Sequence, residues 1–294
     1  MLLQNEALSP QARQHFNLPR NPFLDDVQTP DDVYQTPSVR YVRAALNDCA
    51  QHHGFLAVVG ESGAGKSTLA EDLEERLKAE KKDVTIIRPY VLAMEASDTK
   101  GKTLKASHIA EAILAALAPS TNAKRSPEAR FRQIHNLLKE SSRAGHHHLL
   151  IIEEAHSLPI PTLKHLKRFI ELENGFTPLL SIILIGQDEL KIKLAENNQE
   201  VREVVQRCEI VTLEPFTQTT LVDYLKHRCK AADRNLSDFI DESGLDAIST
   251  KLTRNVGRKN QHESLLYPLA VGNLITGAMN VAAELGAPVI TGDL

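Results

Sequence analysis

The chain has 294 residues, of which 42% are hydrophobic and 24% are charged. These ordinary values exclude the fibrous and disordered classes, and the length allows one large domain or two modest ones. The net charge is −4, so binding to a polyanion would need a local basic patch. Because the chain has no Trp, eight Phe and five Tyr, a site made of stacked aromatic rings is not expected.

The three cysteines, Cys49, Cys208 and Cys229, are isolated and odd in number, which argues against a disulfide framework or a zinc site and favours a reducing compartment. The N-terminus has no apolar run typical of a signal peptide, and no stretch approaches the ~18 apolar residues of a membrane span. We therefore expect a cytoplasmic protein that has no membrane partner.

Residues 1–38 hold five of the 14 prolines, and we expect them to form an extended N-terminal arm because proline at this density breaks helices. Residues 39–53 have a helical pattern. From residue 55 to residue 214, short apolar runs alternate with helical patterns. After Pro215 the strand signal fades and residues 217–285 show mainly helical patterns.

The short apolar runs predict five strands, at 55–59, 84–88, 149–152, 180–185 and 209–213. Continuous apolar runs separated by helices are typical of parallel strands that are buried on both faces. The sequence therefore predicts an N-terminal arm (1–38), a doubly wound α/β domain with a five-stranded parallel sheet (39–214) and a small helical domain (215–294).

The segment Gly60–Ser67, GESGAGKS, matches G-x-x-x-x-G-K-[ST] at every position, after an apolar run and before a helical pattern. In this motif the glycines let backbone N–H groups face a phosphate, Lys66 reaches the β- and γ-phosphates, and the Ser67 hydroxyl ligates Mg²⁺. The predicted nucleotide-binding residues are Gly60, Glu61, Ser62, Gly63, Ala64, Gly65, Lys66, Ser67 and Thr68. An unliganded glycine-rich turn is the alternative.

Two carboxylates, Glu153 and Glu154, follow the apolar run 149–152. They would emerge at the carboxyl end of the sheet, where open α/β sheets bind ligands. We expect Glu153 to hold the Mg²⁺ shell and Glu154 to polarise the attacking water. Glu153 stands where Asp is usual, and its longer side chain would reach the metal through a water. His156 could orient that water or sense the nucleotide, or it could be a simple turn residue.

Taken together, the phosphate loop, the strand ending in Glu-Glu-Ala-His and the helical C-terminal region resemble the AAA+ ATPases. The stretch Leu184–Leu190, LIGQDEL, resembles the L-x-G-Q-x-E-L segment of ExeA-like ATPases. Phe16–Phe23 is similar to the F-x-L-x-x-x-P-F segment of the same group. This group includes the transposition ATPases of the phage Mu B and TnsC/TniB types and the secretion ATPase ExeA.

The resemblance implies an AAA+ P-loop fold with a helical lid, and ATP and Mg²⁺ as cofactors. It places Gln187 at the sensor-1 position and a trans-acting arginine finger at Arg207 or Arg202. Such arginines are also ordinary surface residues. Arg254 and Arg258 are the nearest matches to a sensor-2 arginine, although the usual G-x-P-R pattern is missing.

Residues 99–145 carry a surplus of six positive charges in a chain that is negative overall, a pattern typical of binding to a nucleic-acid backbone. Its nine cations are Lys100, Lys102, Lys105, Lys124, Arg125, Arg130, Arg132, Lys139 and Arg143. We expect the DNA-binding residues to be Lys100, Lys102, Thr103 and Lys105, because the resemblance suggests that this region faces DNA. A solvated basic face is the alternative.

The function that these features predict is that of an ATPase that assembles as a ring or helical filament on duplex DNA without sequence specificity. The resemblance implies that it selects target DNA and delivers it to a transposase. Two alternatives stay open: an ExeA-like secretion ATPase, and a nucleotide-switched DNA scaffold or loader that hardly hydrolyses ATP.

Overall fold

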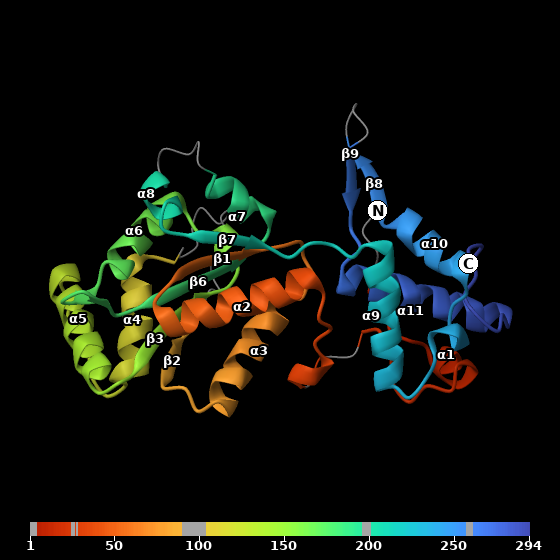
Figure 1. Cartoon of the computed structure of the whole chain (residues 1–294), viewed down its shortest axis with the longest axis horizontal. Coiled ribbons are helices and arrows are strands. Elements are labelled where there is room, and N and C mark those ends of the chain that lie inside the picture. Colours follow the sequence, from red (N-terminus) through yellow and green to blue (C-terminus); the bar gives the residue numbers. More distant parts are fainter. Residues whose placement is uncertain (1–4, 25–26, 28, 90–103, 196–200, 257–260) are drawn as a thin grey trace. The chain divides into compact units, whose positions relative to one another are not determined.

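The computed structural model describes residues 5–24, 27, 29–89, 104–195, 201–256 and 261–294. The chain divides into two compact units, which are treated separately below (Figure 1). The α/β unit comprises residues 37–60 and 66–213, and the helical unit comprises residues 61–65, 214–294 and the described part of 1–36.

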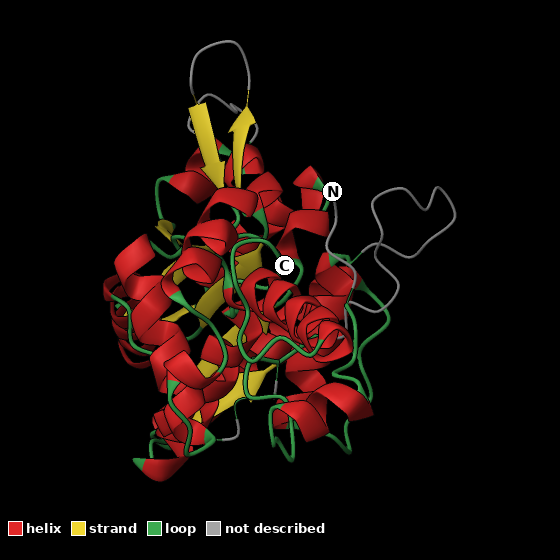
Figure 2. Cartoon of the chain, turned by 90° about the vertical axis from the view of Figure 1, so that its right-hand side faces the viewer, coloured by secondary structure: helices red, strands yellow, loops and turns green. Residues whose placement is uncertain are grey.

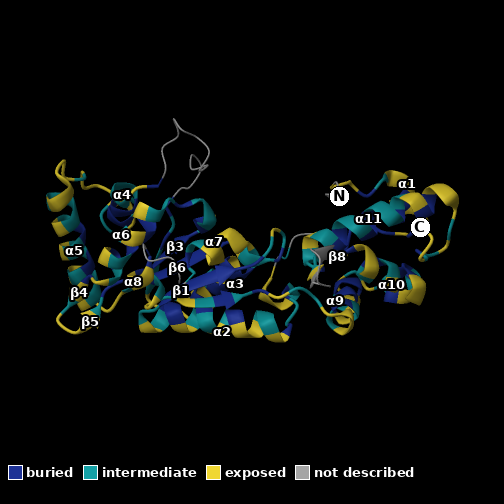
Figure 3. Ribbon diagram, turned by 90° about the horizontal axis from the view of Figure 1, so that it is seen from above, coloured by how far each residue is buried: buried dark blue, intermediate teal, exposed yellow. Residues whose placement is uncertain are grey.

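The α/β unit is built on a five-stranded sheet in the order β2-β3-β6-β1-β7, in which every pair is parallel. Its strands are β1 (Phe55–Val59), β2 (Val84–Ile87), β3 (His147–Ile152), β6 (Ser181–Gly186) and β7 (Glu209–Thr212). These are the five strands expected from the apolar runs, and the predicted parallel α/β fold is confirmed. Strands β1 and β6 are buried along their whole length (Figure 3).

Seven α-helices, one 3₁₀ turn and a short hairpin complete the described part of this unit. The helices are α2 (Pro37–His52), α3 (Lys66–Ala79), α4 (Ala106–Leu117), α5 (Pro127–Arg143), α6 (Ile160–Ile170), α7 (Asp188–Lys193) and α8 (Arg202–Val205). The 3₁₀ turn is Ala155–Ser157, and the hairpin pairs β4 (Glu173–Asn174) with β5 (Thr177–Pro178).

The sheet is covered on both faces. Helices α4, α5 and α6 bury their apolar side chains against the face that carries Phe55, Ala57 and Val59. Because neighbouring residues of a strand point to opposite faces, Leu56 and Val58 face the other side, and they are equally buried. Helix α2 contacts β1, β3, β6 and β7, and also α3. Burial on both faces explains why the strands read as unbroken apolar runs.

The helical unit contains α1 (Pro10–His15), α9 (Gln218–Ala231), α10 (Glu242–Lys251) and α11 (Pro268–Leu285), with 3₁₀ turns at Pro30–Asp32 and Leu236–Asp238. It also contains an antiparallel hairpin of β8 (Thr253–Val256) and β9 (Gln261–Ser264) (Figure 2). No sequence pattern predicts this hairpin, because the segments TRNV and QHES hold too few apolar residues to show the alternation of a strand.

The N-terminal segment is not extended throughout, contrary to our expectation, because it folds as α1 and packs within the helical unit. Leu8, Phe16 and Phe23 are buried in one core with Phe239 of that unit. Pro10 is the first residue of α1, where its missing N–H costs no hydrogen bond, and the Ser9 hydroxyl caps the helix by accepting from the Ala12 N–H. Proline therefore starts this helix.

Within the described residues, none of the helices combines the length and the apolar character that crossing a membrane requires.

Candidate functional site

The segments that follow β1, β3 and β6 meet at one edge of the sheet. In the strand register, Val59 lies beside Gly186, and Ile152 lies beside Leu184. The N–H of Gly60 also donates to the carbonyl of Gly186 over 3.3 Å. The phosphate loop, the carboxylate pair and the sensor-1 candidate therefore all leave the sheet at its carboxyl edge.

Gly186 allows this close approach. A Cβ atom at this position would lie 2.8 Å from the Leu190 side chain and 3.1 Å from the backbone nitrogen of His156. A larger residue would push apart the turn that follows β3 and the helix that follows β6.

The phosphate loop has the backbone shape that its glycines allow. Gly63 and Gly65 have φ angles of +75° and +92°, in the left-handed region that favours glycine. Helix α3 begins at Lys66, whose Nζ donates to the carbonyl of Gly60 over 2.8 Å. The loop therefore runs directly into a helix N-terminus, whose free N–H groups attract anions.

Two residues that the sequence predicts as metal ligands are brought together. The Ser67 hydroxyl donates to Glu153 Oε2 over 3.1 Å, although 86 residues separate them. Both are hard oxygen donors, which suit Mg²⁺. This cation usually keeps several water ligands and is bound in part by the phosphates of the substrate. A cation held here would need only these two protein oxygens, so the residues present fit Mg²⁺.

Arg88, at the end of β2, is a charged neighbour of this pair that sequence reasoning missed. Its Nη1 donates to Glu153 Oε1 over 3.2 Å, and its Nη2 lies 3.0 Å from Oε2 of Glu74 on α3. The signal was present in the sequence, because Arg88 ends a strand whose carboxyl end reaches the same edge as Glu153.

Glu154 lies next to a short chain of polar groups. Its carboxylate Oε2 is 3.5 Å from Nε2 of His156, and Nδ1 of that ring accepts from the backbone N–H of Gln187 over 3.4 Å. Glu154 is exposed and has a φ of +48°, which is rare outside glycine. His156 thus links the second carboxylate to the residue that follows β6.

Lys193, at the end of α7, holds the turn that carries His156. Its ammonium donates to the carbonyls of His156 and Leu158. Burial lowers the pKa of Lys193 below its ordinary value.

Other predicted site residues lie apart from this cluster or outside the described residues. Arg207 follows α8, and its Nη2 lies 3.3 Å from Oε1 of Glu171, while Arg202 is exposed at the start of α8. Arg254 is on β8, not on a helix. Lys105 is exposed at the start of α4. The residues that fall outside the described part of the chain are Lys100, Lys102, Thr103 and Arg258.

Comparison with known proteins identifies the domain that carries this site. The family model described as "AAA domain" matches residues 49–194, from the last turn of α2 to the residue that follows α7. Residues 49–194 are therefore similar to an AAA domain. The matched segment contains the phosphate loop, both carboxylates, Arg88, His156 and Gln187.

Two solved structures share the fold. Cdc6p from Pyrobaculum aerophilum is 16% identical, with a TM-score of 0.59, over 92% of this chain and 67% of that one. The ORC2 protein of Aeropyrum pernix, solved as ADPNP–ADP complexes, is also 16% identical with a TM-score of 0.59, over 94% of this chain and 70% of that one. At this level of identity the likeness shows a shared α/β fold.

One curated relative aligns over a long segment. It is general secretion pathway protein A of Aeromonas hydrophila, which is 24% identical over 225 residues. The match covers 74% of this chain but 38% of the relative, so the chain corresponds to well under half of that protein.

Proposed function

We propose that this domain binds Mg²⁺ and ATP and hydrolyses the nucleotide. The contact that carries the proposal is the 3.1 Å hydrogen bond between Ser67 and Glu153, which joins the start of α3 to the end of β3. This is the pairing that a phosphate loop and its acidic partner strand need in order to hold a metal–nucleotide complex.

The residues at the carboxyl edge of the sheet have separate roles in the proposed reaction. Lys66 and the N–H groups at the start of α3 bind the phosphates, while Ser67 and Glu153 hold Mg²⁺, which when bound would neutralise charge developing on the phosphates. Glu154 orients the attacking water and takes its proton, and the His156 ring fixes the direction of that carboxylate. Gln187 senses the γ-phosphate.

The proposal extends to assembly on duplex DNA and delivery of that DNA to a transposase. It is supported by the resemblance to the Mu B and TnsC type and by the basic charge of residues 99–145. Among the cations of the described part of that segment, Lys105, Lys124, Arg125, Arg132 and Arg143 are exposed. Weak phosphate contacts repeated along a polymer would hold DNA without a base-reading element.

A secretion ATPase of the ExeA type is the second candidate, and the match to general secretion pathway protein A favours it. The same site would then drive assembly of an export channel. DNA binding separates the two candidates, because only the first requires it.

Hydrolysis is tested by single-turnover assays on the Lys66→Ala and Glu154→Gln variants. Lys66→Ala should abolish ATP binding, whereas Glu154→Gln should bind ATP normally and hydrolyse it about 100-fold more slowly or worse, because an amide cannot accept the proton. Glu80→Gln, an exposed change at the end of α3, should behave as wild type. If the wild-type chain hydrolyses ATP as slowly as the Glu154→Gln variant, this result would favour the scaffold alternative.

DNA binding is tested by fluorescence anisotropy of a labelled duplex with ATP over a range of salt concentrations. Changing Lys100, Lys102 and Lys105 to Ala should weaken binding to all sequences alike and lower the slope of log K against log salt by about 0.9 per lost contact. The matched control changes Lys81, Lys82 and Lys191 to Ala. Absence of duplex binding by the wild type would leave the secretion candidate.

A further inference from the structure

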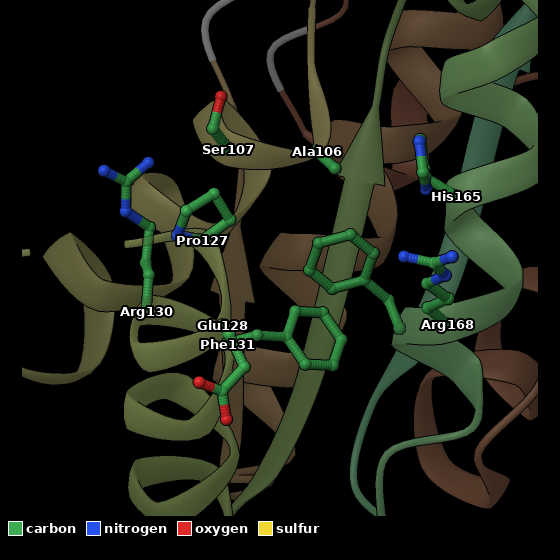
Figure 4. A pocket seen from close by; sticks show the side chains of 10 residues that line it. Ala106, Ser107, Pro127, Glu128, Arg130, Phe131, His165 and Arg168 are labelled. Atoms are coloured by element: carbon green, nitrogen blue, oxygen red, sulfur yellow. The ribbon is translucent and has the colours of Figure 1, made fainter. Parts of the chain in front are cut away.

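A cavity of about 520 Å³ lies within the α/β unit, between the first turns of α4 and α5 and the second half of α6 (Figure 4). Its volume falls within the ~300–1,000 Å³ of ordinary ligand pockets. None of its lining residues belongs to the proposed nucleotide site. The side chains that matter most for its chemistry are Phe131, Phe169, Arg130, His165 and Arg168.

The cavity has an aromatic wall. The rings of Phe131 and Phe169 meet edge to face, with centroids 5.4 Å apart and planes at 61°. Phe169 is fully buried and Phe131 is half-buried, and Figure 4 shows the Phe131 ring between the side chains of Arg130 and Arg168. The small side chains of Ala106 and Ala110 also line the cavity.

Most charges of the rim are already neutralised by neighbours. Arg130 Nη1 lies 3.0 Å from Oε1 of Glu111, and Glu128 is paired with Arg132 of the same helix. Arg168 is different, because it is exposed and no described residue forms an ion pair with it. The rim of this apolar cavity therefore carries one positive charge, on Arg168, that has no ion-pair partner among the described residues.

We propose that this cavity binds a short segment of a partner protein in which an apolar anchor side chain lies next to an Asp or Glu. The anchor would fill the space against Phe131 and Phe169, and the carboxylate would pair with the Arg168 guanidinium, which binds carboxylates through two parallel hydrogen bonds.

Nucleic acid suits the cavity less well than such a segment. Duplex DNA keeps its bases stacked and has no apolar group free to enter a hollow. A single base held between the two rings would need roughly parallel ring faces, and the 61° angle between the two Phe rings does not provide them.

The test selects binders from random 12-residue displayed peptides on the full-length chain without nucleotide or DNA, so that its outcome does not depend on the proposed ATPase. Enriched peptides should combine a large apolar residue with Asp or Glu. Fluorescein-labelled synthetic copies of the enriched peptides should bind Arg168→Glu at least tenfold more weakly than they bind the wild type, as measured by fluorescence anisotropy. Copies with Lys in place of the acid should regain binding to Arg168→Glu.

The matched control is Arg143→Glu, which should leave binding unchanged. It reverses an exposed charge at the far end of α5, about 20 Å from Arg130 of the cavity rim. Phe131→Ala should also weaken binding at least tenfold, with thermal unfolding used to confirm that the variant folds. The proposal is wrong if no peptide is enriched, or if enriched peptides bind Arg168→Glu as well as wild type. It is also wrong if a 12-nucleotide single strand binds the cavity more tightly than the selected peptides.

Discussion

Glu154 combines an unusual backbone with a reactive position. A left-handed conformation costs a non-glycine residue of the order of 1 kcal/mol, and such residues persist where the surrounding structure holds them. Here the buried end of β3 lies on one side and the turn Ala155–Ser157 on the other, with the Ser157 hydroxyl donating to the Glu154 carbonyl over 2.8 Å. This backbone turns the carboxylate toward His156.

His148 is buried, and both of its ring nitrogens form hydrogen bonds. Its Nδ1 is 3.0 Å from the carbonyl of Leu179, which can only accept, so Nδ1 carries a proton. Its Nε2 is 2.8 Å from the Ser141 hydroxyl, which donates to Nε2 when the ring is neutral. Burial is the main cause that lowers the pKa of His148 below its ordinary value.

The folded chain therefore binds fewer protons at His148 than the unfolded chain, so stability should fall as the pH drops through the unfolded histidine pKa of about 6.5. We predict that the fall in Tm between pH 8 and pH 5.5 is smaller in His148→Gln than in wild type. The neighbouring exposed His146→Gln should keep the wild-type pH dependence. Equal falls in Tm for all three proteins would contradict this.

Arg88 makes a second prediction at the residue scale. Its guanidinium neutralises the same carboxylate, Glu153, that is proposed to hold Mg²⁺, so the two cations compete. Removing it in Arg88→Gln should raise the apparent Mg²⁺ affinity about two- to fivefold, a modest effect because the ion pair is partly exposed. Mn²⁺ titration followed by electron paramagnetic resonance, with ATP present, measures this, and exposed Arg125→Gln is the control. An unchanged or weaker affinity would show that Arg88 does not compete with the metal.

At the scale of elements, a buried carboxylate ties α2 to α3. Asp72 of α3 has a side chain that is 1% exposed, and it accepts from Arg43 of α2 over 2.7 and 2.8 Å and from Arg76 over 3.0 Å. The two contacts from Arg43 join the two helices, whereas the contact from Arg76 lies within α3, the helix that starts at the phosphate loop.

Asp72→Ala should lower the free energy of unfolding by roughly 3–5 kcal/mol, because it leaves two partly buried guanidinium groups without their partner. Urea denaturation followed by circular dichroism measures the change. Asp48→Ala, which removes an exposed carboxylate paired with His52 on α2, should cost less than about 1 kcal/mol. A loss for Asp72→Ala no larger than that of this control would mean that the contacts do not hold the helices.

At the scale of the whole molecule, Arg207 is the residue that would connect one copy of the chain to the next. It is exposed, and its contacts are with Glu171 and the carbonyl of Glu203, neither of which belongs to the phosphate loop. If it acts on a neighbour's nucleotide, Lys66→Ala subunits still supply the arginine, and Arg207→Ala subunits still supply a working phosphate loop.

Each variant alone should therefore be inactive, whereas an equal mixture should recover activity at roughly a quarter of its head-to-tail interfaces. Steady-state ATPase assays across mixing ratios, with duplex DNA present, measure the recovery. The same mixture made with Arg202→Ala in place of Arg207→Ala is the control. Recovery only in that second mixture would move the finger to Arg202, and no recovery in either would make both arginines surface residues.

The sequence by itself determined the parallel sheet and the position of the phosphate loop, for a physical reason. Strands buried on both faces must be apolar throughout, and a loop that wraps a phosphate must have glycine where φ is positive, as at Gly63 and Gly65. Glu153 and Glu154 were found in the same way, because charge that directly follows a buried strand must emerge at the edge of the sheet.

Only the tertiary structure decided which side chains meet at that edge. The pairing of Arg88 with Glu153, the link from Glu154 through His156 to Gln187, and the cavity beside Phe131 all depend on strand order and helix packing, which local pattern does not encode. The N-terminal segment shows the same limit. Its prolines suggested an extended arm, but Leu8, Phe16 and Phe23 gain more by burial against Phe239, a residue more than 200 positions away along the chain.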